Sequence, residues 1–314
     1  MLLKQITEVC DLLDTPDISG DKVKKFLKNK GLKDSEIEVV KIEGKKGCTD
    51  LIKIKIGGTN GKSKSLKSPT LGIIGRVGGL GARPEKIGLV SDADGAIIAI
   101  SCAYKIVEMR ERKDFLLGDI IISTHICPNA PTIQHELVKF MDSPVDIHVL
   151  LKHEVDAEMD AILSNDTTRG NRIINHRGFS ISPTVKDGYI LRVSEDLLDI
   201  MQNVTGKPPV VLPITMQDIT PYGNNIYHLN SIMQPSTVTS APVVGVAITS
   251  ELPIAGCSTG VTQIIDIEMA ARFNIEVAKA FGKGNCKFYN EKEFEEILKR
   301  YGPSMLSHKY FRMK

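Results

Sequence analysis

The sequence predicts an α/β fold, and three observations lead to this prediction. Short apolar runs rich in β-branched residues, the pattern of buried strands, recur along the chain. Longer segments with apolar residues at helical spacing lie between these runs. The 314 residues are 42% apolar, which is enough to form a sizeable core. This length fits one large α/β domain or two smaller ones.

The elements can be placed in order along the chain. Two amphipathic helices come first, and the run Asp14-Thr15-Pro16 separates them. Two strands joined by the turn-rich segment 43–47 follow, and strands and helices then alternate. We expect helices at residues 2–14, 21–30, 94–113, 194–204, 260–281 and 291–301. We expect strands at residues 37–42, 51–56, 70–74, 88–91, 118–124, 161–166, 210–214 and 243–249, and two shorter strand-like pieces within 173–185.

The composition excludes several classes of protein. Lys and Arg (40) nearly balance Asp and Glu (38), and there is no Trp, so we expect no nucleic-acid partner. No apolar stretch is long enough for a signal peptide or a membrane span, so we expect a cytoplasmic protein with no membrane partner. The six cysteines contain no C-x-x-C pair, which is typical of reduced thiols and argues against a structural zinc knuckle.

Four segments are similar to catalytic motifs, and three of them lack a required residue. Segment 57–63 lacks the first glycine of a phosphate-binding loop, and segment 75–84 has Pro84 where a dinucleotide-binding loop needs its last glycine. His153-Glu154 lacks the second histidine of H-E-x-x-H, so we expect a surface pair there. Segment 256–260 does match the G-x-S-x-G pattern of serine hydrolases, with Ser258 as the candidate nucleophile.

Carboxylates stand where predicted strands end. Asp92 and Asp94 lie just before a long predicted helix, and Asp166 ends the strand at 161–166. In open α/β sheets ligands bind at the carboxyl ends of strands, so Asp92 and Asp166 converge on one site if their strands are neighbours. Paired acids at such a site can hold a metal or act as acid and base. The alternatives are that Asp94 only caps its helix and that Asp166 only forms a turn.

Other polar residues follow the same strands. His125 and Cys127 come after the strand at 118–124 and would share one face, as metal ligands or as a base and a nucleophile. The alternative is a hydrogen-bonded histidine and a small buried thiol in the core. We assign a substrate-binding role to polar residues that follow Asp166 or lie in the loop at 217–225: Thr167, Thr168, Arg169 and Asn224.

The chain resembles, over nearly its full length, an uncharacterised prokaryotic family known as domain of unknown function 1177. This resemblance brings no established activity. It rests on four segments: Gly88-Leu89-Val90-Ser91-Asp92-Ala93-Asp94-Gly95-Ala96, Thr124-His125-Ile126-Cys127-Pro128, Asp166-Thr167-Thr168 and Gln217-Asp218-Ile219-Thr220-Pro221-Tyr222-Gly223.

The order of elements is also similar, more distantly, to that of the co-catalytic zinc exopeptidases, such as glutamyl aminopeptidase and the acetylornithine deacetylase-like enzymes. That resemblance implies a three-layer α/β/α sandwich with a central mixed sheet. Asp92 and Gly95 match the D-x-x-G context of the family's bridging metal ligand, and Asp166 matches a later acidic ligand. The chain has little room beyond this core, so we expect a single domain at 1–314 without a separate lid or dimerisation domain. Related enzymes commonly assemble, which leaves a homo-oligomer open.

Other positions depart from the family's pattern. Arg76-Val77-Gly78 stands where the family has its first H-x-D ligand, and His125-Ile126-Cys127 stands where it has a Glu-Glu pair. No histidine occurs at 256–263, where the final ligand would fall. In the place of a metal ligand, Arg76 would bind a substrate carboxylate or phosphate through two hydrogen bonds, unless it is an ion-paired or surface arginine.

Three functions therefore remain open. The first is hydrolysis of a peptide or amino-acid amide at an altered site, where Asp92 and Asp166 hold one divalent metal, zinc or manganese. His125 or Cys127 would then be the third ligand, and Asp94 or His125 would accept the proton. The second is non-catalytic binding of a peptide or amino acid on a degenerate peptidase fold, with or without a divalent metal. The third is a metal-free hydrolase with Cys127 or Ser258 as nucleophile.

Overall fold

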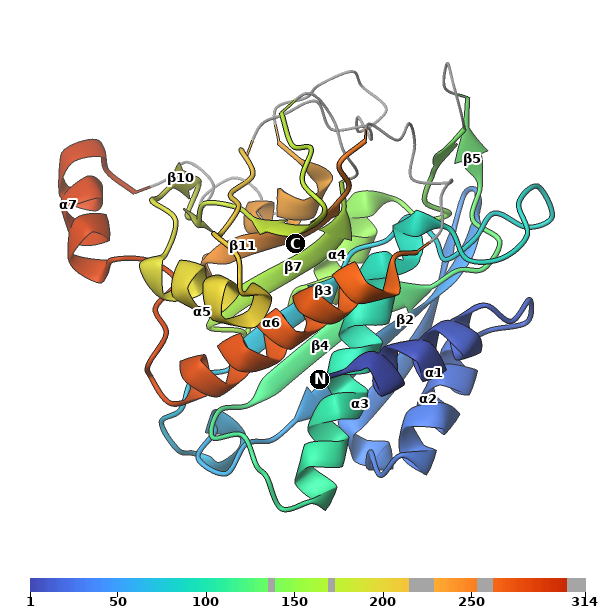
Figure 1. The fold of residues 1–314 in the computed structure, drawn as a ribbon, viewed down its shortest axis with the longest axis horizontal. Coiled ribbons are helices and arrows are strands. Elements are labelled where there is room, and N and C mark those ends of the chain that lie inside the picture. The colour runs from blue at the N-terminus through green and yellow to red at the C-terminus, as the bar shows by residue number, and fades with distance from the viewer. Residues whose placement is uncertain (135–138, 169–172, 215–228, 253–261, 304–314) are drawn as a thin grey trace.

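The chain folds around one large mixed sheet (Figure 1). The computed structural model describes residues 1–134, 139–168, 173–214, 229–252 and 262–303. Within these residues nine strands form the large sheet, and two more, β5 and β6, form a separate hairpin. The strands are β1 (Ile37–Gly44), β2 (Gly47–Ile56), β3 (Leu71–Gly75), β4 (Ile120–Ile126), β5 (Thr132–Ile133), β6 (Phe140–Met141), β7 (Ala161–Thr167), β8 (Gly178–Ile181), β9 (Val185–Lys186), β10 (Tyr189–Ile190) and β11 (Val243–Thr249). The helices are α1 (Leu3–Leu13), α2 (Gly20–Asn29), α3 (Asp94–Glu111), α4 (Ile147–Glu154), α5 (Glu195–Thr205), α6 (Ile264–Gly282) and α7 (Glu291–Tyr301).

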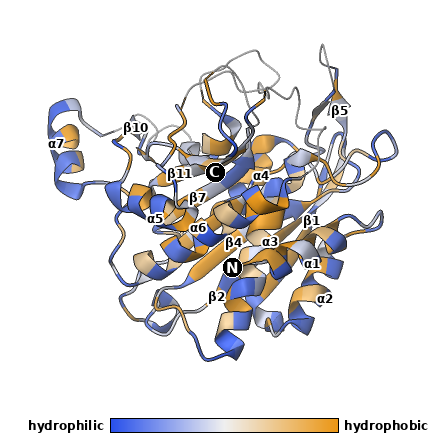
Figure 2. Ribbon diagram, in the orientation of Figure 1, coloured by the Kyte–Doolittle hydropathy of each residue, from blue (hydrophilic) through white to orange (hydrophobic). Residues whose placement is uncertain are grey.

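Parallel strands form the centre of the sheet, in the order β4, β3, β7 and β11. Antiparallel strands extend it on both sides, with β2 and β1 beyond β4, and β8 and β9 beside β11. Successive residues of β3 face opposite layers, since Ile73 packs in the core on one face and Ile74 in the core on the other. Strands buried on both faces need apolar residues at successive positions, as in the run at residues 120–122 of β4, which is orange in Figure 2.

Helices cover both faces of the sheet. α1, α3 and α6 lie on the near face in Figure 1, where α3 packs on β3, β4 and β7. α4 and the 3₁₀ helix Ser231–Thr237 cover the other face, where Ile232 belongs to the same core cluster as Ile74. The prediction of a three-layer α/β/α sandwich with a mixed sheet is therefore confirmed. In the part of the chain that the structure describes, no helix is long and apolar enough to cross a membrane.

Two buried asparagines join α6 to the centre of the sheet. Asn165 of β7 and Asn274 of α6 are fully buried. Nδ2 of Asn274 donates to Oδ1 of Asn165 at 2.7 Å, and Nδ2 of Asn165 donates back at 3.1 Å. Nδ2 of Asn165 also donates to the carbonyl oxygen of Ile74 at 3.2 Å, and Nδ2 of Asn274 to that of Ala270 at 2.8 Å. The two bonds between the side chains hold α6 against β7.

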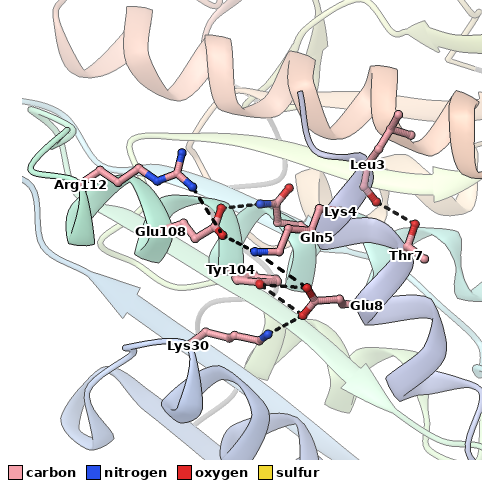
Figure 3. Close-up of polar contacts among 9 residues, drawn as sticks. All are labelled: Leu3, Lys4, Gln5, Thr7, Glu8, Lys30, Tyr104, Glu108 and Arg112. Carbon is pink, nitrogen blue, oxygen red and sulfur yellow. Dashed lines mark hydrogen bonds and ion pairs between the residues drawn. The ribbon is translucent and has the colours of Figure 1, made fainter.

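A polar network attaches the N-terminal helices to α3 (Figure 3). Glu8 of α1 accepts a hydrogen bond from Oη of Tyr104 at 3.2 Å and pairs with Lys30 at the end of α2. Nζ of Lys30 also lies 4.8 Å from the ring centre of Tyr104, and Nζ of Lys4 lies 2.9 Å from Glu108. Since Tyr104 is almost fully buried, this network holds α1, α2 and α3 together as one unit.

Two predicted strands are absent. Residues 88–91 form no strand, because Gly88 has φ +89° and the chain then enters the 3₁₀ helix Ser91–Ala93. The strand that leads toward Asp92 is instead β3, from which a long loop runs to this 3₁₀ helix. Residues 210–214 make only a single bridge, between Val211 and Ile181, because prolines on either side remove hydrogen-bond donors.

The sequence analysis also missed elements between β4 and β7. The hairpin of β5 and β6 and the helix α4 were not expected, and α6 begins at Ile264 rather than at residue 260. The prediction of a surface pair at His153-Glu154 was wrong for the glutamate. Glu154 is fully buried at the end of α4, where the guanidinium of Arg76 compensates its charge.

We expect Asn274→Ala to lower the free energy of unfolding by about 2 kcal/mol or more, because the buried Oδ1 of Asn165 loses the donor Nδ2 of Asn274. Urea unfolding followed by circular dichroism measures this. Asn203→Ala, on the exposed side of α5, is the control and should stay within about 0.5 kcal/mol of the parent chain. Similar losses in both variants would contradict the role given to the pair.

Candidate functional site

The ends of β3 and β7 place predicted site residues beside one another. Arg76 follows β3 directly, and its backbone N–H donates to the carbonyl oxygen of Asn165 in β7 at 2.8 Å. Asp166 and Thr167 are the next two residues and complete β7. Because β3 and β7 are parallel neighbours, their charged residues meet at one edge of the sheet.

Two glycines allow the start of α3 to lie directly on these strand ends. A Cβ added to Gly75 would overlap the carbonyl oxygen of Gly95, and a Cβ added to Gly95 would overlap the carbonyl oxygen of Arg76. Any larger residue at either position would push the helix away from the sheet. The close approach brings Asp92, just before α3, to the edge where Arg76 and Asp166 lie.

Asp92 is buried and bonded to the loop that follows β3. Its Oδ2 accepts the backbone N–H groups of Gly78 and of Gly79, the latter at 2.8 Å. Burial raises the pKa of Asp92 to about 6, and the charge of Asp94 adds to this rise. The two backbone donors and the charge of Arg76 oppose the rise in pKa. Asp92 can therefore change its protonation state near neutral pH.

Asp94 connects three parts of the structure and lies behind the cavity. Its Oδ2 lies 2.9 Å from Oγ1 of Thr167, and its Oδ1 accepts from Oγ1 of Thr262 at 3.0 Å. Oγ1 of Thr167 also lies 2.8 Å from the carbonyl oxygen of Ser91. Asp94 is fully buried and is the first residue of α3, with no side-chain cap at that helix start. These contacts give Asp94 a role in fixing α3 against β7.

Arg76 is held by two side chains from the opposite layer. Its Nη1 donates to Oε2 of Glu154, and its Nη2 donates to Oε1 of Gln234. Arg76 is 5% exposed and Glu154 fully buried. Within the described residues, Oε1 of Glu154 has no hydrogen-bond partner. A charged pair buried in this way is costly to break, so the guanidinium has a fixed position.

These residues line one cavity of about 520 Å³. Its polar floor comes from the strand ends and two 3₁₀ helices: Arg76, Asp92, Asp166, Thr167, Ser231 and Gln234. Its wall is largely apolar and comes from the loop after β3, the hairpin, the segment after it and α4: Val77, Ile133, Met141, Pro144, Val145, Ile147 and Val149. The β1–β2 turn adds Lys45 and Lys46 at the side, where Lys46 pairs with Asp142.

Besides Asp94, three predicted site residues do not line this cavity: His125, Cys127 and Thr168. Both ring nitrogens of fully buried His125 have partners, with Nδ1 2.9 Å from Oγ1 of Thr49 and Nε2 2.7 Å from the carbonyl oxygen of Val77. Burial lowers the pKa of His125 and raises the pKa of the Cys127 thiol to about 11. Thr168 follows β7, and its backbone N–H donates to the carbonyl oxygen of Ile248 in the neighbouring strand β11 at 2.9 Å. Both His125 and Cys127 are buried, and neither lines the cavity.

Comparison with known proteins identifies the family. The family model described as "Protein of unknown function (DUF1177)" matches residues 40–310. The chain belongs to this family. No curated protein matches it.

Solved structures show which fold the family has. Glutaminyl cyclase from an Acidobacteriales bacterium is 14% identical at a TM-score of 0.50, with 90% of this chain and 94% of that chain covered. A mutant of tomato leucine aminopeptidase is 9% identical at a TM-score of 0.50, with 87% of this chain and 61% of that chain covered. At these identities the likeness shows the fold alone, which is of the zinc-exopeptidase type.

The described side chains do not fit a zinc or manganese ion. No group of three or more His, Cys, Asp or Glu residues in the described ranges could hold a metal. Asp92 and Asp166 share the cavity, but the expected third ligands, His125 and Cys127, are buried away from it. The guanidinium of Arg76, whose charge acts on Asp92, carries only donors and cannot coordinate a metal ion.

Some site residues lie outside the described residues, and others were missed. Arg169, Asn224 and Ser258 fall in the ranges 169–172, 215–228 and 253–261, which the structure does not describe. The sequence analysis did not find Glu154, Ser231 or Gln234. Only Glu154 could have been found from the sequence. Asp146 is a recognisable helix cap, and the helix α4 that it starts ends at Glu154. Ser231 and Gln234 reach the cavity through tertiary packing alone.

We expect Asp92→Asn to stabilise the protein more at pH 7.5 than at pH 4.5. A buried carboxyl whose pKa is raised from 3.8 to about 6 favours its neutral form, so its ionisation costs stability as the pH rises through this window. The difference between the two pH values should be roughly 2 kcal/mol in urea unfolding. Asp17→Asn is the control, since Lys22 lowers the pKa of exposed Asp17. A pH-independent effect of Asp92→Asn would contradict the raised pKa.

Proposed function

We propose that the protein binds a short peptide or an amino-acid amide in the cavity at Arg76, Asp92 and Asp166. The observation that supports this proposal is the division of one cavity into a charged floor and an apolar wall. Cavities of this size that combine apolar walls with a few convergent polar groups are typical small-ligand sites. A ligand that fills both parts needs a polar or cationic end and an apolar side chain.

The floor suits the amino group of such a ligand. Both backbone donors of Asp92 bond to its Oδ2, so Oδ1 can accept a bond from the ligand. Asp166 lines the same floor from β7, with its Oδ2 3.2 Å from Oγ of Ser231. An ammonium group carries three donors, and charge-assisted bonds to carboxylates are the strong ones. Two carboxylates in one cavity therefore favour a cationic amine over a neutral or anionic group.

The wall suits the side chain of the ligand. Met141, Val145 and Val149 come from three successive segments that line the cavity. Arg76, held by Glu154 and Gln234, lines the same cavity, and its charge acts on Asp92. From that position its charge can face the carbonyl oxygen of a bound amide.

We expect L-leucinamide to bind at least about tenfold more tightly than N-acetyl-L-leucinamide, because acetylation removes the cationic amine. A tenfold difference corresponds to about 1.4 kcal/mol, the size of one hydrogen bond to a charged group. Isothermal titration calorimetry at pH 7.5 measures both ligands.

Two variants show whether a carboxylate at the floor of the cavity or one at its rim contributes to the affinity for L-leucinamide. Asp166→Asn should weaken L-leucinamide binding by about tenfold, whereas Asp142→Asn, which removes a rim carboxylate paired with Lys46, should leave it within about twofold. Equal affinity for the free and the acetylated amine would contradict an amine site at the floor.

A second candidate function is hydrolysis of the bound amide, which the pKa of Asp92 near 6 favours. In this reaction a water oxygen attacks the amide carbonyl carbon while Asp92 takes the proton of the water. The proton then passes to the leaving amine as the C–N bond breaks. The charge of Arg76 would stabilise the oxygen anion of the intermediate.

Release of ammonia from L-leucinamide tests this second function. We expect the rate to rise with pH and to level off above about pH 6, where Asp92 is ionised, and to fall by about 100-fold or more in Asp92→Asn. EDTA should not change it. Activity that EDTA abolishes and zinc or manganese restores would instead favour the metal-bound hydrolase that the sequence resemblance implies.

A further inference from the structure

We propose that the outer edge of β1 is an interface between two copies of this chain, which pair β1 with β1 in one antiparallel register. The pairing extends the large sheet across a twofold axis, so that the same strand faces itself from both sides. It concerns the edge of the sheet and not the cavity, so it does not depend on the proposed function.

β1 is the longer of the two edge strands of the large sheet. It forms one end of the sheet with eight residues, whereas β10 at the other end has two. In the described part of the chain β1 pairs only with β2, and no backbone group of residues 38–43 forms a hydrogen bond beyond that ladder. About half of the N–H and C=O groups of an edge strand point away from its neighbour. The edge of β1 therefore offers a row of backbone groups to another extended strand.

Two charged side chains near the end of β1 lie on the same face of the sheet. Lys41 and Glu43 are exposed, and neither forms an ion pair within the described residues. Side chains alternate along a strand, so both share the face of Val39, which packs against the core under α1, α2 and α3. Ile42, between them, belongs to the core cluster on the opposite face. Lys41 and Glu43 can therefore meet a neighbouring strand without leaving a core.

One register pairs both of these charges with unlike charges. When two copies of a strand pair antiparallel about a twofold axis, directly opposite residues share a face, so the allowed registers differ by steps of two residues. With Ile42 opposite the partner's Ile42, Lys41 lies opposite the partner's Glu43, and Glu43 opposite the partner's Lys41. This forms two unlike pairs across the interface, one on each side of the axis.

The two neighbouring registers are disfavoured by the same charges. A shift by two residues in one direction places Lys41 opposite Lys41, and a shift in the other direction places Glu43 opposite Glu43. Like charges directly opposite one another are destabilising. Charges on an edge strand usually oppose any pairing, but their order in β1 opposes only the wrong registers.

The same register also complements the charge of the β1–β2 turn. Glu38 is exposed and lies four residues before Ile42, so the partner's Glu38 is level with Lys46, four residues after it. Lys45 and Lys46 are both exposed at this turn. Complementary charges at three positions of one short edge favour a second copy of this chain over an unrelated strand.

The test is sedimentation velocity of the full chain and four variants over a range of protein concentrations. Lys41→Glu and Glu43→Lys each place like charges opposite one another on both sides of the axis. The double variant Lys41→Glu/Glu43→Lys restores unlike pairs with the partners exchanged. Lys292→Glu makes the same charge change as Lys41→Glu on exposed α7, on the other side of the molecule in Figure 2, and is the matched control.

We expect the parent chain to dimerise with a Kd of about 1 to 100 μM, because a single strand edge is a small interface. Each single reversal should raise this Kd by at least about tenfold, and the double variant should return to within about threefold of the parent chain. Lys292→Glu should dimerise like the parent chain. Circular dichroism shows whether each variant is folded, which we expect because the substituted positions are exposed.

Three outcomes would overturn the proposal. The first is a parent chain that stays monomeric at every concentration measured. The second is a dimer that the single reversals do not weaken, or that Lys292→Glu weakens equally. The third is a folded double variant that stays monomeric, because exchanged charges must restore pairing in this register. Binding of L-leucinamide does not enter this measurement, so failure of the proposed function and failure of the interface are separate results.

Discussion

The contact of Gly75 with Gly95 is the constraint on which the rest of the site depends. Without side chains at these two positions, the first turn of α3 lies directly against the ends of β3 and β7. The helix start then brings Asp92 to the sheet edge that already carries Arg76 and Asp166. A side chain at either glycine would separate the helix from the strands, and the three charged residues would no longer share a cavity.

Charges gathered in this way must be compensated, and the surrounding layers do this. Glu154 from α4 and Gln234 from a 3₁₀ helix bond to Arg76 from one face of the sheet. The loop after β3 supplies Asp92 with two N–H groups, and that loop is bonded in turn to the segment that follows β4. The site therefore depends on both faces of the sheet and on the segment after β4.

The sequence indicated which polar residues follow predicted strands, but not what surrounds them. Arg76, Asp166 and Thr167 line one cavity because β3 and β7 are parallel neighbours that end at the same edge, and Asp92 reaches this cavity from the 3₁₀ helix before α3. His125 also follows a strand, yet Thr49 and Val77 take both of its ring nitrogens. Nothing local distinguishes the two cases, since the partners of His125 come from distant segments of the chain.

The sequence by itself determined the α/β class, most of the elements and the acidic strand ends, because these follow from apolar spacing and from the residues next to each run. Only the tertiary structure decided the order of the strands, the pairing of Arg76 with Glu154 and the path of the chain before Asp92. The pattern of apolar residues records which side chains are buried. It does not record which segments meet there, because burial is a property of one residue and a contact is a property of two.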